Sequence, residues 1–434
     1  MVSRSALDQS LFEKFSAALL LVITLLLAVL LVKAPGTSDL EMFLTWGTLA
    51  QDHGLVGGYE VMVDKWPETV LGGDRSAGGG EYPPLGFAWI YVVCELADVF
   101  GVPHFLAFKL ALLASGYVST GMMWCFSRSI AIAAVYQGAI VLSASGLGYT
   151  DVVAAPLLIG ALWAIRDERP VFGSILFLVS VLLKWQALVI APFLLIHMLR
   201  ISDLPSTARL FFRPLTFQLV AVGVLAALCT GAIFGTYPPR AFLSALRHPY
   251  LSANTLNMPW VATFALRLLG SPDYAVWKEV TFLALPVPYL LPFKAIFFIL
   301  FGFVLARYIH VAKTFSHCMF FCVLGVVTYG VWNSAVHENH WFIAMVPAFL
   351  LASESRAWPE RWIVILVAVM FNVNLFVFYG ITGREVVART VGLDLSVPLA
   401  LVFTTVWLLF LWHGLSIAPV KDAHLSPRGD AIQP

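Results

Sequence analysis

Long runs of apolar residues recur along most of this 434-residue chain. A run of about 20 apolar residues forms a helix long enough to cross the hydrocarbon core of a bilayer, which soluble folds do not need. Composition agrees, because 60% of the residues are hydrophobic and only 12% are charged. The sequence therefore predicts an all-α polytopic membrane protein, with residues 1–434 forming a single integral membrane domain.

The apolar runs predict about twelve transmembrane helices. They are placed near residues 15–32, 105–126, 130–147, 151–165, 170–184, 186–200, 214–235, 285–306, 315–332, 339–353, 361–380 and 396–414. The run from Leu85 to Phe100 follows two prolines and contains Glu95 and Asp98, so it is expected to be a surface or re-entrant helix. The first run lacks a cleavage pattern and predicts an uncleaved anchor.

Basic residues orient this topology. With twelve crossings, the basic residues of the short loops all fall on one side, which the positive-inside rule assigns to the cytoplasm together with both termini and a short tail, residues 415–434. The opposite, external face then receives two long segments, residues 33–104 and 236–284, the first of which should carry short surface helices. The net charge of +1 offers no basic surface for nucleic acid, so nucleic-acid binding is excluded.

Unusual polar residues also gather on the predicted external side. The first external segment contains Asp39, Glu41 and the run Glu81-Tyr82-Pro83-Pro84, and further polar residues follow at the ends of later crossings: Asp151, Lys184, Gln186, Arg247, Asn254, Asn257, His337, Glu338 and His340. Ionisable groups near a bilayer usually face a water-filled cavity or a partner. These polar residues could therefore line one cavity on the external side.

Each of these residues also has a structural interpretation. Asp39 could cap a surface helix. Glu41 could be an acid of the first helical turn that the helix dipole stabilises, and Lys184 could extend its amine to the membrane surface. His337 and His340 could bind a metal with Glu338, but the spacing of a metalloprotease helix and a third ligand are missing, so no metal and no cofactor are predicted.

The order of these motifs resembles the GT-C superfold of membrane glycosyltransferases. The likeness covers residues 15–380 and includes Asp-x-Glu with Trp46, the acidic-Tyr-Pro-Pro run, Lys109 at the start of the second crossing, the turn Gly148–Asp151, Lys184-Trp185-Gln186 and His337-Glu338. It is greatest to the polyprenyl-phosphate-sugar-dependent glucosyltransferases that extend the asparagine-linked glycan precursor, and to their bacterial relatives. Asn339 stands where that family has a lysine, and the turn lacks the family's histidines.

The resemblance implies an inverting transfer of one hexose from a polyprenyl-phosphate sugar to an acceptor hydroxyl on the external face. It implies Asp39 as general base, assisted by Glu41, and Lys184, Lys109, Arg247 or His337 as the group that stabilises the departing phosphate. Donor binding would involve the other external polar residues named above. The partners would be a lipid-linked donor, a lipid-linked or membrane-proximal glycan acceptor and membrane lipid.

Two other classes remain open from the residues alone. A polyprenyl-linked sugar flippase or small-solute transporter would also have a dozen crossings, but its ionisable groups should lie near the bilayer midplane. A non-catalytic scaffold would not need acids clustered on one side. A bacterial inner membrane with a periplasmic site is the expected location, and the endoplasmic reticulum with a lumenal site is the alternative.

Overall fold

The computed structural model describes residues 4–69, 80–201, 213–246, 251–268, 287–355, 358–385, 387 and 395–419. Almost all of this described part is helical. The α-helices are α1 (Arg4–Leu31), α2 (Ser38–Thr69), α3 (Pro84–Phe100), α4 (His104–Ser127), α5 (Ile130–Val141), α6 (Asp151–Arg166), α7 (Pro170–Leu183), α8 (Ala191–Met198), α10 (Pro214–Phe234), α11 (Tyr237–Leu246), α12 (Met258–Leu268), α13 (Val287–Ile309), α14 (Phe315–Trp332), α15 (Phe342–Glu354), α16 (Trp358–Tyr379) and α17 (Ser396–Ser416).

Short helices of other types also occur in the described part of the chain. They are the π-helix η1 (Leu142–Leu147) and the 3₁₀-helices η2 (Trp185–Ile190) and η3 (Glu338–Trp341). Two strands of two residues each, β1 (Ser252–Ala253) and β2 (Val336–His337), pair in parallel. This pairing was not expected from the sequence, and it attaches the segment after α11 to the segment before η3.

Every apolar run predicted as a crossing coincides with a helix, which confirms the all-α membrane class. Seven helical segments in the described part are long and apolar enough to cross a membrane: His104–Ser127, Ile130–Leu147, Pro214–Phe234, Leu290–Ile309, Phe315–Trp332, Glu360–Tyr379 and Ser396–Ser416. Shorter apolar helices span Phe15–Leu31, Pro170–Leu183 and Trp185–Met198. Because an apolar helix that faces lipid need not bury its side chains, α10 can leave all of its residues except Phe234 half-buried or exposed.

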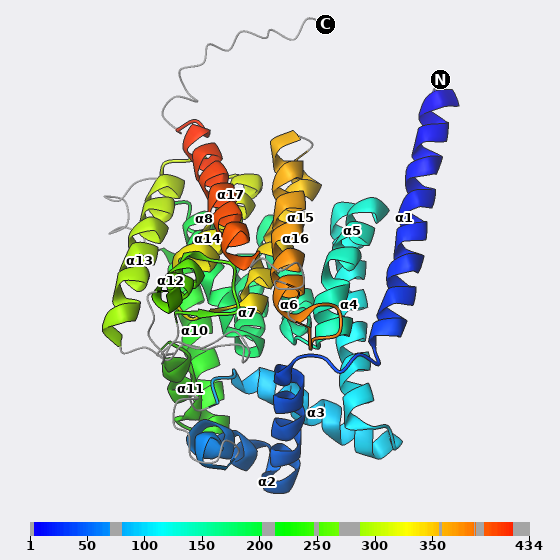
Figure 1. The fold of residues 1–434 in the computed structure, drawn as a ribbon. Coiled ribbons are helices and arrows are strands. Elements are labelled where there is room, and N and C mark those ends of the chain that lie inside the picture. The colour runs from blue at the N-terminus through cyan, green and yellow to red at the C-terminus, as the bar shows by residue number, and fades with distance from the viewer. Residues whose placement is uncertain are drawn as a thin grey trace, which may run out of the picture.

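The helices run mainly along one direction. Of the segments predicted to be external, α2, α3 and α11 lie at one end, whereas α12 lies at middle height near α13 (Figure 1). The first residues of α1 and the last residues of α17 lie at the opposite, upper end. At the lower end, α2 changes direction at Gly54, where φ is +72°, a conformation that glycine adopts without a steric penalty. α3 lies across the bundle beneath the vertical helices.

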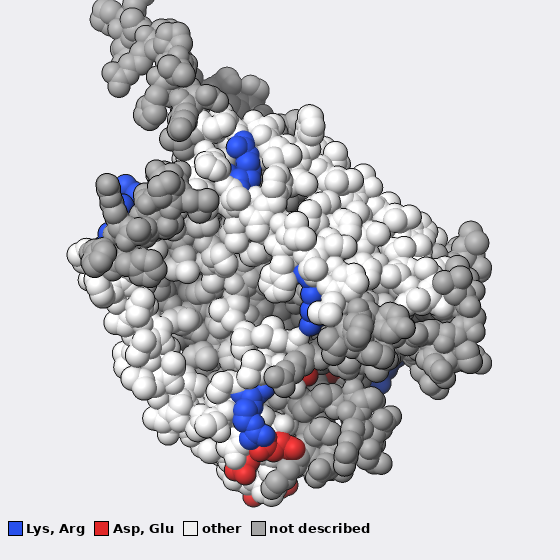
Figure 2. All heavy atoms as spheres, turned by 90° about the vertical axis from the view of Figure 1, so that its left-hand side faces the viewer, with Lys and Arg blue, Asp and Glu red and all other residues white. Residues whose placement is uncertain are grey.

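The side that carries α13 shows how charge is distributed (Figure 2). Uncharged side chains cover most of this face, and the surface near its middle is hollowed. The acidic side chains visible here lie in its lower part, where a basic group adjoins them, and further basic side chains lie at its middle and upper end. At the lower end Arg240 of α11 forms an ion pair with Asp64 of α2, which attaches two surface helices to each other. A face covered mostly by uncharged side chains fits a protein whose sides contact the hydrocarbon core of a bilayer.

The core sits where α14 and α15 pass through the middle of the bundle. α14 packs against α13, α15 and α17, while α15 also contacts α4, α6 and α16. The side chains of α15 from Phe342 to Leu351 are all buried, so this helix has protein on every side. Since η3 immediately precedes α15, the central helix holds the polar residues 337–340 at the lower end of the core.

Candidate functional site

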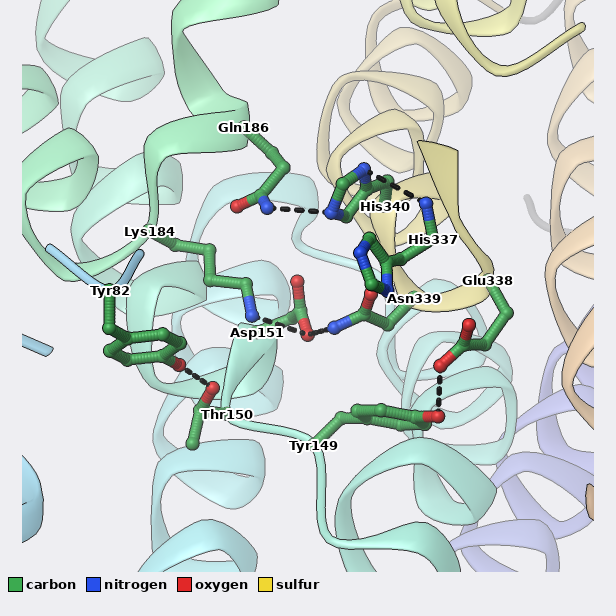
Figure 3. A network of polar contacts seen from close by, with 10 residues as sticks. All are labelled: Tyr82, Tyr149, Thr150, Asp151, Lys184, Gln186, His337, Glu338, Asn339 and His340. Carbon is green, nitrogen blue, oxygen red and sulfur yellow. Dashed lines mark hydrogen bonds and ion pairs between the residues drawn. The ribbon is translucent and has the colours of Figure 1, made fainter. Parts of the chain in front are cut away.

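Breaks between helices create the site. The α7 helix ends at Leu183, and Lys184 has an extended backbone with φ −154° and ψ 112° before η2 begins. In the same way Tyr149 and Thr150 separate η1 from α6, and His337 precedes η3. Side chains at such breaks can point toward the interior between the helices. Figure 3 shows ten residues from these breaks and the neighbouring elements, whose polar groups lie close together.

A buried ion pair lies at the centre of this convergence. Lys184 Nζ is 3.5 Å from Asp151 Oδ2, and the same carboxylate oxygen accepts a 2.9 Å hydrogen bond from the amide of Asn339 (Figure 3). All three side chains are buried, although Asp151 Oδ1 has no hydrogen-bond partner in the described structure. Asp151 is also the first residue of α6, where the helix dipole favours its negative charge.

The segment before α3 reaches this pair through Tyr82. The ring of Tyr82 lies under the ammonium of Lys184, with 5.0 Å between Nζ and the ring centroid. Its hydroxyl forms a hydrogen bond with the hydroxyl of Thr150. Tyr82 therefore joins the segment before α3 to both the Lys184 break and the turn that carries Asp151.

Asp39 faces the cluster from the start of α2. Its charge acts on Lys184 and Asp151, and also on Glu338, Tyr149 and Tyr379. Burial raises the pKa of Asp39 to about 6; Lys184 partly opposes this increase and Asp151 adds to it. The side chain nevertheless remains partly accessible. A carboxylate that is accessible and titrates near neutral pH is suited to accept a proton from a ligand.

Glu338 is the third acid of the cluster, after Asp151 and Asp39. It is buried, and its Oε1 accepts a hydrogen bond from Tyr149 across 189 residues of sequence. Burial first, and the negative charge of Asp39 second, raise the pKa of Glu338 to about 8. Glu338 is therefore mostly protonated at neutral pH, so Asp39 is the acid of this pair that carries the charge.

The two histidines are ordered by η3. His340 Nδ1 accepts the backbone N–H of His337 at 3.3 Å and lies 3.0 Å from the hydroxyl of Tyr329. The amide of Gln186 lies 2.7 Å from Nε2 of His340. The atom of Gln186 in this contact is the amide nitrogen Nε2, which can donate to an unprotonated Nε2 of His340, while the amide oxygen of Gln186 has no hydrogen-bond partner among the described residues.

The two asparagines of the segment after α11 have supporting roles. Asn254, at a φ of +52°, donates a 2.8 Å hydrogen bond to the hydroxyl of Tyr379. Asn257 caps α12 by accepting the N–H of Trp260 at 2.8 Å. Asn254 thus contacts a residue of the cluster, whereas Asn257 fixes the helix beside it.

Three residues predicted for the site lie apart from this cluster. Glu41 is exposed and forms an ion pair with Arg384, so the structure does not bring it beside the buried acids. Glu81 is half-buried and accepts a 3.3 Å hydrogen bond from Ser244 of α11. Lys109 is fully buried, but its Nζ donates to the backbone carbonyls of Ser145 and Gly146. Arg247 lies outside the described residues.

Some residues of the cluster were not predicted from the sequence. Tyr149, Tyr379 and Asn374 all contact Glu338 or its partners; Asn374 donates to the carbonyl of Glu338 at 3.1 Å. Two asparagines inside the apolar run 361–380 were a usable signal, because an amide in a membrane helix normally faces a partner. The tyrosines gave no such signal, since tyrosine is common at membrane interfaces.

The cluster contains groups that can accept or donate a proton and a cation that can bind a negatively charged group of a ligand. It combines an accessible acid, Asp39, a buried acid whose raised pKa favours the protonated form, Glu338, an ion pair between Asp151 and Lys184, and imidazole groups. No group of three or more His, Cys, Asp or Glu side chains suited to a metal ion occurs among the described residues. No model of a known protein family matches the sequence, and a search of curated proteins finds no match to it either.

Proposed function

We propose that this chain is an inverting glycosyltransferase of the GT-C type, which transfers one hexose from a polyprenyl-phosphate sugar to an acceptor hydroxyl. The observation that carries the proposal is Asp39, a partly accessible carboxyl with a pKa of about 6 at the edge of a buried cluster that contains Lys184. At pH 7 about nine-tenths of such a group is ionised and can act as a base.

The reaction is a single displacement. Asp39 accepts the proton of the acceptor hydroxyl while that oxygen forms a bond to the anomeric carbon. The bond between the anomeric carbon and the phosphate oxygen breaks, and its electron pair leaves with the polyprenyl phosphate. Because attack and departure occur on opposite faces, the anomeric configuration inverts.

Lys184 and His337 are the described groups that could stabilise the leaving phosphate. An ammonium has three donors; Lys184 directs them at Asp151 and Tyr82 in the described structure, so a ligand oxygen would take the remaining one. His337 is half-buried, and its ring centroid lies 5.1 Å from that of His340. Positive charge next to the departing oxygen lowers the barrier more than it stabilises the bound donor, since the negative charge grows during the reaction.

The membrane arrangement supports a lipid-borne donor. The cluster lies at the ends of helices that reach through an apolar body, and a hollow opens on the face seen in Figure 2. We propose twelve crossings, with the cluster at the external surface and the polyprenyl chain lying against the apolar helices. A transporter is less well supported, because its ionisable groups should occur within the helices near the midplane.

A donor screen tests this function. Purified protein is incubated with the polyprenyl phosphates of glucose, mannose and galactose and with glycolipid acceptors, and release of polyprenyl phosphate is measured. The proposal expects release with one donor, and an inverted linkage in the product. If proteoliposomes instead move an intact lipid-linked sugar between leaflets without breaking it, the flippase alternative replaces this function.

A further inference from the structure

Lys109 is a buried cation that the proposed reaction does not use. It lies in α4 with no exposed surface, and its Nζ donates 2.8 Å hydrogen bonds to the carbonyls of Ser145 and Gly146. Among the described residues no carboxylate forms an ion pair with it. Burying an ammonium without a counter-ion is costly, so such groups are usually retained for a role.

The two carbonyls belong to the end of the π-helix η1. The last carbonyls of any helix lack partners within the helix, and the negative end of the helix dipole attracts a cation there. π-Helical turns are rare and give a wider, less regular backbone than an α-helix. An ammonium that bridges two successive carbonyls can hold this irregular end in one conformation.

The end of η1 is also the point where the two parts of the site meet. The carbonyl of Leu147 accepts the backbone N–H of Thr37 at 3.0 Å and the Thr37 hydroxyl at 3.4 Å. Thr37 is two residues before Asp39. One helix end therefore anchors the segment that carries the proposed base.

The same helix end anchors the turn that carries the ion pair. The carbonyl of Ser143 accepts the N–H groups of Gly148 at 3.1 Å and Tyr149 at 3.0 Å. Two residues later, Asp151 begins α6 and contacts Lys184. The distance between Asp39 and Asp151 is thus set through η1, and Lys109 holds the carbonyls that lie between the two anchor points.

We propose, on the basis of the transferase function above, that Lys109 is a positioning residue that fixes Asp39 relative to Asp151 by binding the end of η1, and that it does not contact the donor phosphate. The effect on catalysis would be indirect but large. A displacement of about 1 Å at a reacting group can reduce a rate by roughly a hundredfold.

Lys109→Met tests the proposal, because methionine keeps the length of the apolar stem and removes the ammonium. Hydrogen exchange followed by mass spectrometry should show at least about tenfold faster exchange in peptides covering residues 34–40 and 143–151, since their N–H bonds depend on η1. Peptides of α14 should exchange at the wild-type rate. Unchanged exchange at both anchor points would overturn the proposal, whether or not any transferase activity is found.

The kinetic test separates positioning from donor binding. In Lys109→Met, kcat should fall at least about tenfold with the KM for the donor nearly unchanged. The acid limb of the pH profile should also move below pH 6, because water that enters beside Asp39 reduces the burial that raises its pKa. A raised KM with unchanged kcat would instead make Lys109 a donor-binding residue.

Lys313→Met is the matched control. Lys313 also donates to helix-end carbonyls, those of Tyr308 at 2.8 Å and Ile309 at 3.0 Å, but it precedes α14 at the other end of the bundle. Its loss should reduce thermal stability without changing the pH profile. Lys109→Arg, which keeps the charge and the donors, should restore part of kcat. If Lys109→Met does not fold, Lys109→Gln provides the comparison with a shorter neutral donor.

The outcomes distinguish this inference from the function on which it rests. If wild-type protein cleaves no polyprenyl-phosphate sugar, the transferase function fails, while the exchange data still decide whether Lys109 anchors both segments. If wild-type protein is active and Lys109→Met behaves like Lys313→Met in every measurement, Lys109 is only a stabilising residue and the inference fails.

Discussion

The ammonium of Lys184 lies 3.5 Å from a carboxylate oxygen of Asp151, and almost no surface of either side chain is exposed. The pair joins the break after α7 to the first turn of α6. Buried pairs of this kind contribute little net stability, but removing one partner leaves an uncompensated charge in the protein interior.

Removing one member of this pair should therefore cost more than removing both. Lys184→Met is expected to lower the free energy of unfolding by about 3–5 kcal/mol, whereas Lys184→Met combined with Asp151→Asn should recover most of that loss. Thermal unfolding in detergent measures both. If the two effects were strictly additive, the two side chains would not interact. Neither variant is expected to transfer sugar.

Asp39→Asn should abolish transfer while expression and thermal stability remain near wild type. The amide cannot accept the proton of the acceptor hydroxyl, and a positioned base usually contributes about 10²–10⁴-fold to the rate. Donor turnover at saturating acceptor is the measurement. Glu41→Gln is the matched control: its exposed pair with Arg384 lies outside the cluster, so activity should change less than about threefold. Full activity in Asp39→Asn would remove Asp39 from the mechanism.

Stability should fall as the pH rises from about 4.5 to about 8. In the folded protein the pKa of Glu338 is about 8, above its ordinary value of 4.5, so the folded state holds a proton that the unfolded chain releases. Its stabilising effect is complete below pH 4.5 and is lost as the pH passes through 8. Glu338→Gln should flatten this decline in a series of melting curves. An equally steep decline in Glu338→Gln would assign it to another group.

His337→Ala should raise the donor concentration needed for half-maximal rate, and transfer should persist in chelator. His337 is the half-buried member of the histidine pair beside Asn339, and a neutral or charged imidazole can bind a phosphate oxygen. Initial rates across a donor series, with and without chelator, provide the test. Activity that disappears in chelator and returns with magnesium or manganese would favour a metal-bridged phosphate instead.

The proposed topology makes a prediction about accessibility. In a background without native cysteines, a membrane-impermeant maleimide applied from the external side should label Asp52→Cys in α2 and not Glu168→Cys, which lies between α6 and α7. Both positions are exposed in the protein, so the membrane alone decides which is labelled. Equal labelling of Glu168→Cys would invert the arrangement of the loops.

The sequence determined the elements of this protein. Each apolar run became a helix because hydrophobicity over some 20 residues is a local property, and Pro83 and Pro84 gave α3 its start. Asp39, Asp151 and Lys184 were identified because an ionisable side chain at the end of an apolar run is costly without a partner.

Only the tertiary structure decided which of those side chains meet. Asp151 and Asn339 are 188 residues apart, and Tyr149 and Glu338 are 189 residues apart, so no local pattern could pair them. Glu41 and Lys109 showed the same kind of signal as Asp39 and Lys184, yet one lies in an exposed ion pair and the other binds the end of η1. The physical reason is that hydrophobicity sets which segments are helical, whereas the position of a polar group depends on where neighbouring helices break and pack.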